Sequence, residues 1–310
     1  MKNRFTLGTV WILILGIGVF SCSSDQEKQA RIRLEQARNL YHGGQLETAM
    51  QLLDSIQIWY PDQFGIVGKA LKLQDSVAYD YHTQLIRSAS VMLDSLEPGV
   101  KLLSKNFRWI PGKAGQPGMY EHKRQTVRNS WNRTFLKVNI NNRGEMWLTS
   151  HYYGKEWIDH FCIKVYHRDH YIFSDTIPLG NPWNRKVQDM DDKWETIDFR
   201  EGTDNGVIGF IVDHNDEPLK VRFTGKKFYY IVMEKFDRLA VKEGYELAQV
   251  LSEIYQLKQT IKRNQKAIRL LRTRQVSSDT IIRNQYQHEK TTDSLNLPDS
   301  RSSDTPDSGS

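Results

Sequence analysis

A hydrophobic seam near the C-terminal end constrains the fold of this chain more than any other feature. Its members are separated by alternating steps of three and four residues, which is the pattern of one long amphipathic helix. The pattern predicts a helix over residues 236–275, which would reach roughly 58 Å at ~1.5 Å per residue. The seam consists of Leu247, Val250, Ile254, Leu257, Ile261, Asn264, Ile268 and Leu271.

Two uses of this seam fit its spacing. Isoleucine at the first position of the heptads and leucine at the fourth favour a parallel two-stranded coiled coil, with a protein partner or in a homodimer. Asn264 would then cost stability but fix the register. The same face could instead pack against the N-terminal helices of its own chain, and the spacing alone does not choose between the two.

The N-terminal end has the features of an export signal. Lys2 and Arg4 precede the apolar stretch Leu7–Phe20. That stretch is short for a membrane-spanning helix and typical of a secretory signal. No later stretch approaches the length of a membrane span, so a multi-span membrane protein is excluded.

The segment Val19-Phe20-Ser21-Cys22 follows and resembles the lipobox of bacterial lipoproteins. In that motif a small residue precedes a cysteine that becomes lipid-modified. The resemblance implies a signal peptide over 1–21, lipid attachment at Cys22 and a linker over 22–29. The alternative is an ordinary cleaved signal followed by an incidental cysteine.

A lipid anchor would make the membrane a partner of the chain and place the chain in the cell envelope. Ser23 follows the anchor, whereas an aspartate there retains many lipoproteins at the inner membrane. The outer membrane is therefore the expected location, with its periplasmic and surface faces both open. Nucleic acid is not an expected partner of an exported protein. Cys162 would be the one remaining cysteine, and we expect a buried, inert thiol.

Residues 30–105 are predicted to be helical and to contain a single tetratricopeptide-like hairpin. Small residues stand where two helices would cross closely, and Gly43-Gly44 would form the turn. The following helix does not repeat the pattern and would end at Glu97-Pro98-Gly99. The hairpin would serve as a concave protein-binding surface or as a structural cap. The positions that fit the frame are Ala37, Leu40, Gly44, Leu46, Ala49, Leu53, Ile56 and Pro61.

Residues 107–235 have the composition of a β domain. Leu136, Val138 and Ile140 alternate with polar residues, which is typical of a half-buried strand. The continuously apolar run Val207–Val212 is expected to be a central strand. We expect an antiparallel β sandwich or a curved sheet. The predicted strands are Thr134–Asn141, Met146–Tyr152, Ile158–His167, Tyr171–Ile177, Glu195–Phe199, Val207–Asp213, Leu219–Thr224 and Phe228–Glu234.

Spacing alone assembles no catalytic or metal site in this domain. His167 and His170 come nearest to a metal cluster, but they fall at an expected turn, and a zinc site needs three or four ligands. Asp189-Met-Asp-Asp192 lacks the glycine and the distal glutamate of a calcium loop. The chain has no Gly-rich phosphate loop and no nucleophile elbow. We therefore predict no catalytic residue, no metal and no cofactor.

Tryptophans are dense in the same domain and could contact a ligand. Trp183 lies between Pro182 and Asn184 in an expected loop, so it is the best candidate for stacking on a sugar or a peptide. The alternative role of these residues is to fill the core.

Polar segments end the chain. Seven basic and no acidic residues lie between Ile254 and Ser278. This stripe could meet an acidic partner, lipid headgroups or an anionic polymer, or it could be a solvated helix face. Residues 276–310 are rich in Ser, Asp and Thr and are expected to be disordered.

The order of these parts, with Trp194-Glu195 and Asp204-Asn-Gly206 in the β domain, resembles uncharacterised envelope lipoproteins of Bacteroidales-type bacteria. That resemblance carries no activity. The expectation is an α+β chain with a helical hairpin, an antiparallel β domain and a long heptad helix. Its expected function is non-enzymatic: a lipid-anchored cell-envelope protein that mediates protein–protein interaction or assembly. The alternative is a lipoprotein whose β domain binds a glycan or a peptide.

Overall fold

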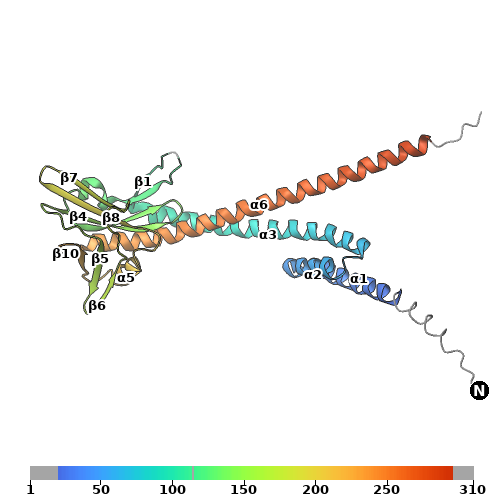
Figure 1. The fold of residues 1–310 in the computed structure, drawn as a ribbon, viewed down its shortest axis with the longest axis horizontal. Helices are drawn as coiled ribbons and strands as arrows, with labels where there is room; N and C mark the ends of the chain where they lie inside the picture. The colour runs from blue at the N-terminus through green and yellow to red at the C-terminus, as the bar shows by residue number, and fades with distance from the viewer. Residues whose placement is uncertain (1–19, 114, 296–310) are drawn as a thin grey trace, which may run out of the picture. The chain divides into compact units, whose positions relative to one another are not determined.

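The computed structural model describes residues 20–113 and 115–295, with side chains over 24–113 and 115–274. It divides into two units, of which the first holds residues up to Arg87 and from Lys262 onward. The second holds Ser88–Ile261. The predicted α+β class, with antiparallel sheets and a long C-terminal helix, is confirmed (Figure 1).

The N-terminal helices form the core of the first unit. Helices α1 (Phe20–His42) and α2 (Leu46–Trp59) make a hairpin, and α3 (Phe64–Leu103) follows. Ala37 and Ala49 are fully buried, because small side chains let α1 and α2 approach closely. The remaining buried apolar residues of this unit are Ala30, Leu34, Leu53, Ile56, Ile66, Ala70 and Val77.

The expected helix end at Glu97-Pro98-Gly99 is wrong, because α3 continues through Pro98 to Leu103. Proline removes one intrahelical hydrogen bond. Val100 and Leu103 lie beyond it and pack against the apolar core of the second unit, which offsets that loss.

The last helix, α6 (Lys235–Leu295), is longer than predicted. Residues 276–295 were expected to be disordered, but their backbone is helical. Adding a residue to an existing helix costs far less free energy than nucleating a new helix. The sequence also has no proline between Lys235 and Pro298 that would end the helix. Residues 296–310 of the expected tail lie outside the described part of the chain.

All eight residues of the heptad seam are at least partly buried within this single chain. Leu247 and Ile254 are 0% and 8% exposed. Nδ1 of His82 on α3 lies 2.7 Å from Oδ1 of Asn264, which is itself 9% exposed. The described seam therefore has partners in its own chain, and a coiled coil with a second chain stays a prediction.

The β strands form two antiparallel sheets in the second unit, one with the order β1-β2-β3-β4-β8-β7 and one with the order β10-β9-β5-β6 (Figure 1). Within each sheet every neighbouring pair is antiparallel. The bounds are β1 (Phe107–Ile110), β2 (Met119–His122), β3 (Phe135–Asn141), β4 (Met146–Gly154), β5 (Cys162–His167), β6 (His170–Phe173), β7 (Asn184–Asp189), β8 (Asp192–Phe199), β9 (Lys220–Thr224) and β10 (Phe228–Val232).

One predicted strand is wrong: the apolar run is the helix α5 (Val207–Asp213). A short continuous apolar run fits a buried helix as well as a buried strand. Here Gly206 has φ +82°, and Oδ2 of Asp204 accepts a hydrogen bond from the Ile208 N–H at 3.1 Å, so the backbone starts a helical turn. Val207, Ile208 and Ile211 form its buried face.

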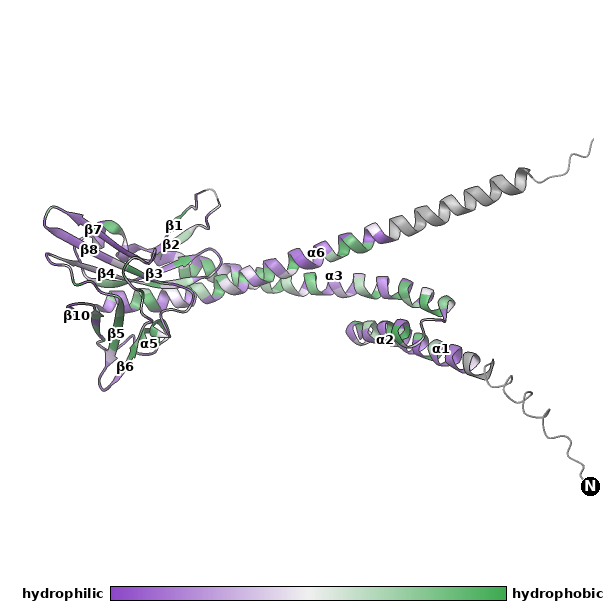
Figure 2. Cartoon of the chain, viewed as in Figure 1, coloured by the Kyte–Doolittle hydropathy of each residue, from purple (hydrophilic) through white to green (hydrophobic). Residues whose placement is uncertain are grey.

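The core of the second unit is shared by both sheets and the first part of α6. Ile140 on β3, Phe223 on β9 and Leu247 on α6 are all fully buried in one apolar cluster. Gly244 lets α6 lie close to β3, since an added Cβ would come 2.9 Å from Val138 Cγ2. Hydrophobic and hydrophilic residues alternate along α3 and α6 (Figure 2). Across the described helices, none has the length and hydropathy of a membrane span.

Candidate ligand-binding site

The outward face of the six-stranded sheet is polar and hollowed. Strand alternation points Leu136, Val138 and Ile140 into the core, so Lys137 and Asn139 point the other way. They line a pocket of about 280 Å³. Its lining residues are Met119, Lys137, Asn139, Trp147, Thr149, His151, Arg185, Thr196, Asp198 and Arg200.

A hydrogen-bonded chain fixes the floor of this pocket. Nδ2 of Asn139 donates to Oγ1 of Thr149 at 2.8 Å, and that hydroxyl donates to Oδ1 of Asp198 at 2.5 Å. Arg185 donates to the other Asp198 oxygen at 3.0 Å. Asp198 is 6% exposed, so its charge is held by these donors rather than by water. The floor is therefore preorganised.

Arg200 lies at the rim with unused hydrogen-bonding capacity. Its guanidinium carbon lies 3.8 Å from the ring centroid of Trp147 and 4.4 Å from that of Trp183. Its Nε is buried without a hydrogen-bond partner among the described residues, and it is 4.0 Å from Asp198 Oδ2. Burial lowers the pKa of Arg200 from its ordinary value. The indoles of Trp147 and Trp183 thus hold the guanidinium of Arg200, which has fewer hydrogen-bond acceptors around it than it has donors.

The predicted ligand contact, Trp183, therefore lies next to a charged group. This residue is 40% exposed, and its backbone N–H donates to Asn181 Oδ1 at 2.8 Å. Sequence reasoning missed Arg200. The sequence did contain a signal for it. Thr196, Asp198 and Arg200 alternate with apolar residues along β8 and just beyond its end, so their side chains are expected on the same face of the sheet.

His151 closes the other end of the pocket as a neutral ring. Its Nδ1–H donates to the backbone carbonyl of Arg133 at 3.0 Å, which leaves Nε2 as an acceptor. Burial lowers the pKa of His151 to about 4. On β2, Glu121 is 6% exposed and accepts hydrogen bonds from Lys137 and Arg108.

The low pKa of His151 predicts acid sensitivity of the fold. In the unfolded chain the imidazole of His151 is protonated as pH falls below 6.5, the ordinary histidine pKa. In the folded chain it stays neutral until about pH 4. Stability should therefore fall over this window, by up to about 3 kcal/mol, and level off below it. Denaturant unfolding at several pH values measures this. His151→Asn, which keeps a donor toward Arg133, should flatten the profile between pH 6.5 and 4. An unchanged profile in this variant would contradict the assignment.

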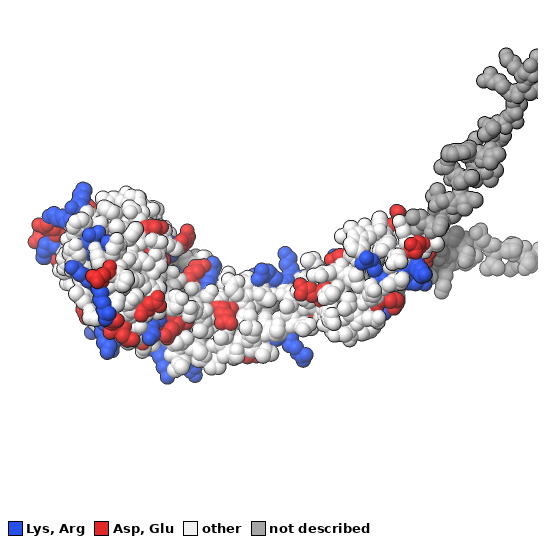
Figure 3. Space-filling view, turned by 90° about the horizontal axis from the view of Figure 1, so that it is seen from below, with Lys and Arg blue, Asp and Glu red and all other residues white. Residues whose placement is uncertain are grey.

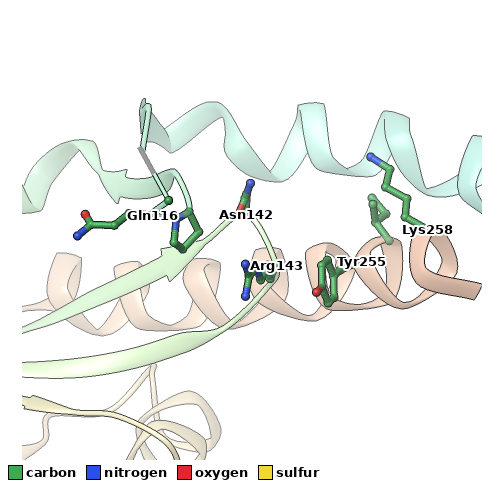
Figure 4. A pocket seen from close by; sticks show the side chains of 8 residues that line it. Gln116, Asn142, Arg143, Tyr255 and Lys258 are labelled. Carbon is green, nitrogen blue, oxygen red and sulfur yellow. The ribbon is translucent and has the colours of Figure 1, made fainter. Parts of the chain in front are cut away.

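A second pocket, of about 420 Å³, lies between the loop that joins β1 to β2, the turn after β3, and α6. Arg143 at this turn lies beside Tyr255 on α6, with its guanidinium carbon 5.8 Å from the centroid of the tyrosine ring (Figure 4). Lys258 and Arg143 give it a positive character, and neither cation has a carboxylate partner among the described residues. Its complete lining is Gly115, Gln116, Pro117, Asn142, Arg143, Ile254, Tyr255 and Lys258.

Ser150, His160 and Glu195 have the connectivity of a nucleophile, a base and an orienting acid. Ser150 Oγ lies 2.8 Å from His160 Nε2, and His160 Nδ1 lies 2.7 Å from Glu195 Oε2. All three residues are 0% exposed. Catalysis needs a reacting atom of the substrate within about 3 Å of the nucleophile, and this burial leaves no room for one. The group is a structural clamp.

The other singled-out polar residues form local pairs. Nε2 of His167 lies 2.8 Å from Glu217 Oε2, and its ring lies 4.3 Å from that of His214. Among the described residues no three His, Cys, Asp or Glu side chains are grouped as metal ligands. Cys162 is half-buried, and burial raises the pKa of its thiol.

The expected lipid-attachment residue, Cys22, lies in the first turn of α1, with its side chain outside the described part. Residues 1–19 of the expected signal peptide also lie outside it. On the face shown in Figure 3, Lys and Arg are interspersed with Asp and Glu.

The pocket at Arg200 is the best-defined site of the second unit, because it combines a fixed floor with an under-satisfied cation. The chain matches no family model, no curated protein and no solved structure. Its function therefore has to follow from the chemistry of its own residues.

Proposed function

We propose that this chain is a lipid-anchored cell-envelope protein that works by binding, without enzymatic activity, and that its β unit captures a carboxylate-bearing glycan or peptide. The observation that carries the proposal is Arg200, which is held between Trp147 and Trp183 and donates no side-chain hydrogen bond among the described residues. Its closest carboxylate oxygen, Asp198 Oδ2, is 4.0 Å from its Nε. An envelope location rests on the lipobox resemblance at Cys22.

The chemistry of the pocket favours an acidic ligand. Lys137, Arg185 and Arg200 supply three cations to its lining, against the single carboxylate of Asp198. A guanidinium whose faces are covered by rings still donates from its edge, and a carboxylate is the planar acceptor that fits this edge. Trp183, which is 40% exposed, offers apolar surface to the sugar ring or side chain that bears the carboxylate.

The absence of an enzymatic role is supported by the closed state of Ser150, His160 and Glu195. Their side chains meet one another, and those of His160 and Glu195 also belong to a buried hydrogen-bond network. A binding protein needs no reactive group at its pocket, and the fixed Asn139–Thr149–Asp198 chain suits a site that holds its ligand without changing it.

Membrane anchoring predicts that Cys22 alone determines fatty-acid incorporation. When cells that express the native chain are grown with an alkyne-labelled fatty acid, the chain should carry the label and sediment with membranes. Two or more acyl chains give stable anchoring. Cys22→Ser should lose the label. Cys162→Ser, which removes the other cysteine, is the matched control and should keep the label. Label that persists in Cys22→Ser would refute the anchor.

A second candidate function is protein–protein contact through the helices, and exposed apolar residues of the first unit favour it. Phe64 is 81% exposed, Ile58 71% and Trp59 56%. These residues flank the turn between α2 and α3, and apolar patches of this kind mark partner sites. Light scattering on the chain lacking residues 1–21 tests the homodimer: a mass of two chains supports it, and a mass of one chain refutes it.

A further inference from the structure

The outward face of the four-stranded sheet presents cations among exposed rings. Ile163 and Val165 on β5 are fully buried, so Lys164 between them points away from the core. The same alternation on β9 points Lys220 and Arg222 outward. We propose that this cationic face, formed by Lys164, Lys220, Arg222 and the aromatic rings around them, docks on an anionic lipid bilayer.

Electrostatic repulsion within the face is the first argument. Lys164 stands directly opposite Arg222 in the β5–β9 register, and Lys220 lies two residues before Arg222 on the same strand. Like charges directly opposite each other destabilise a sheet. None of the three cations forms an ion pair among the described residues, and the register puts no acidic residue on this face. An external anion would relieve the repulsion.

Aromatic rings hold these cations in place. Lys164 Nζ lies 3.2 Å from the ring centroid of Tyr171, and Lys220 Nζ lies 4.4 Å from that of Tyr230. The Arg222 guanidinium lies 4.8 Å from that of Phe228. Each cation thus rests against a ring at the surface, where the quadrupole of the ring stabilises it.

Exposed apolar surface distinguishes a bilayer from a soluble polyanion as the occupant. Phe173 is 52% exposed, Phe228 59% and Val232 63%, and the β-strand register puts all three on the same face as the cations. A soluble polyanion would pair with the cations but leave the side chains of Val232, Phe228 and Phe173 in water. In a bilayer the headgroup phosphates meet the cations, while aromatic and aliphatic side chains enter the interfacial layer.

The docking does not depend on the lipid anchor, so the two can fail separately. The test uses the chain that lacks residues 1–21 and carries Cys22→Ser, so that neither the apolar N-terminal stretch nor an acyl chain contributes. It measures co-sedimentation with vesicles. Vesicles containing phosphatidylglycerol should bind the protein in a salt-sensitive way, and vesicles of phosphatidylcholine alone should bind it weakly. Lys164→Gln with Arg222→Gln should lower the partition coefficient by about tenfold or more, and Phe228→Ser should lower it without changing the charge.

The matched control removes two exposed cations elsewhere in the same unit, with Lys105→Gln and Arg128→Gln, and should retain most of the binding. Circular dichroism confirms that each variant is folded. If the control and the Lys164→Gln, Arg222→Gln variant lose vesicle binding equally, the effect comes from net charge alone and the proposal is overturned. Absent vesicle binding, together with binding to polygalacturonate that depends on Lys164 and Arg222, would instead assign the face to a soluble polyanion.

Discussion

Glu195→Ala is expected to destabilise the β unit by about 3–5 kcal/mol, because it removes the acceptor of a buried network. Glu195 Oε1 accepts the backbone N–H groups of Ile158 and Asp159 at 2.8 and 2.9 Å. Its Oε2 accepts the backbone N–H of His160 at 2.8 Å and lies 2.7 Å from His160 Nδ1. The substitution would leave these donors buried and unpaired, and the segment before β5 would lose its attachment to β8.

The measurement is denaturant unfolding of the whole chain, read at a signal of the β unit. Glu156→Ala is the matched control, because Glu156 is 70% exposed and pairs with Lys227 at the surface. Such pairs contribute between about 0 and 1 kcal/mol, so this control should unfold nearly as the native chain does. If both variants unfold alike, the clamp contributes nothing and the account of the β5 segment is wrong.

The same carboxylate predicts a loss of stability in acid. Burial raises the pKa of Glu195, but the hydrogen bonds from His160 and the Ile158 N–H lower it by more, so the pKa lies below its ordinary value. A carboxyl group with a depressed pKa stabilises the fold above its unfolded pKa, and this contribution is lost as pH falls through the folded pKa. The His151 effect begins at higher pH, which separates the two in a titration.

Arg200→Lys is expected to weaken ligand binding by about 10- to 100-fold, which matches the ~1.5–3 kcal/mol of a charge-assisted hydrogen bond. Lysine keeps the charge but lacks the planar fork and stacks poorly between two indoles. Calorimetric titration with acidic oligosaccharides and acidic peptides measures the change and identifies the better class of ligand.

Arg168→Lys is the control for that titration. Arg168 has a 73% exposed side chain at the turn between β5 and β6, outside the pocket. The substitution should leave affinity unchanged. If Arg168→Lys and Arg200→Lys weaken binding equally, the effect does not come from the pocket, and the role given to Arg200 is wrong.

The sequence predicted the elements that carry a clear hydrophobic period. The seam residues indicated α6, and alternation at Leu136, Val138 and Ile140 indicated β3, because a periodic pattern directly reflects which face is buried. The hairpin of α1 and α2 was found through its small residues at the helix crossing.

Elements without such a period were missed or misassigned. Strands β1, β2 and β7 have mainly polar or exposed positions, and β7 has only Asn184 buried. The apolar run Val207–Val212 has no period at all, so its helical form was decided by the capping Asp204 and by packing. Helix α3 passes Pro98 because tertiary contacts outweigh one lost hydrogen bond.

The pocket itself could be predicted only in part. Trp183 was identified from its loop composition, but nothing local joins it to Trp147 or to Arg200. That meeting depends on the pairing of β4 with β8, in which Thr149 stands opposite Asp198. Such long-range pairing is invisible to a period or a motif, so the under-satisfied guanidinium became visible only in the structure.

The most direct test of the account compares one acidic oligosaccharide with the same oligosaccharide after reduction of its carboxyl groups to alcohols. Shape and hydrogen-bonding hydroxyls stay nearly constant, and only the acceptor for Arg200 is lost. The acidic form is predicted to bind the β unit and to change the fluorescence of Trp147 and Trp183, whereas the reduced form should bind at least about tenfold more weakly. Equal binding of both forms would contradict the central claim that this site recognises a carboxylate.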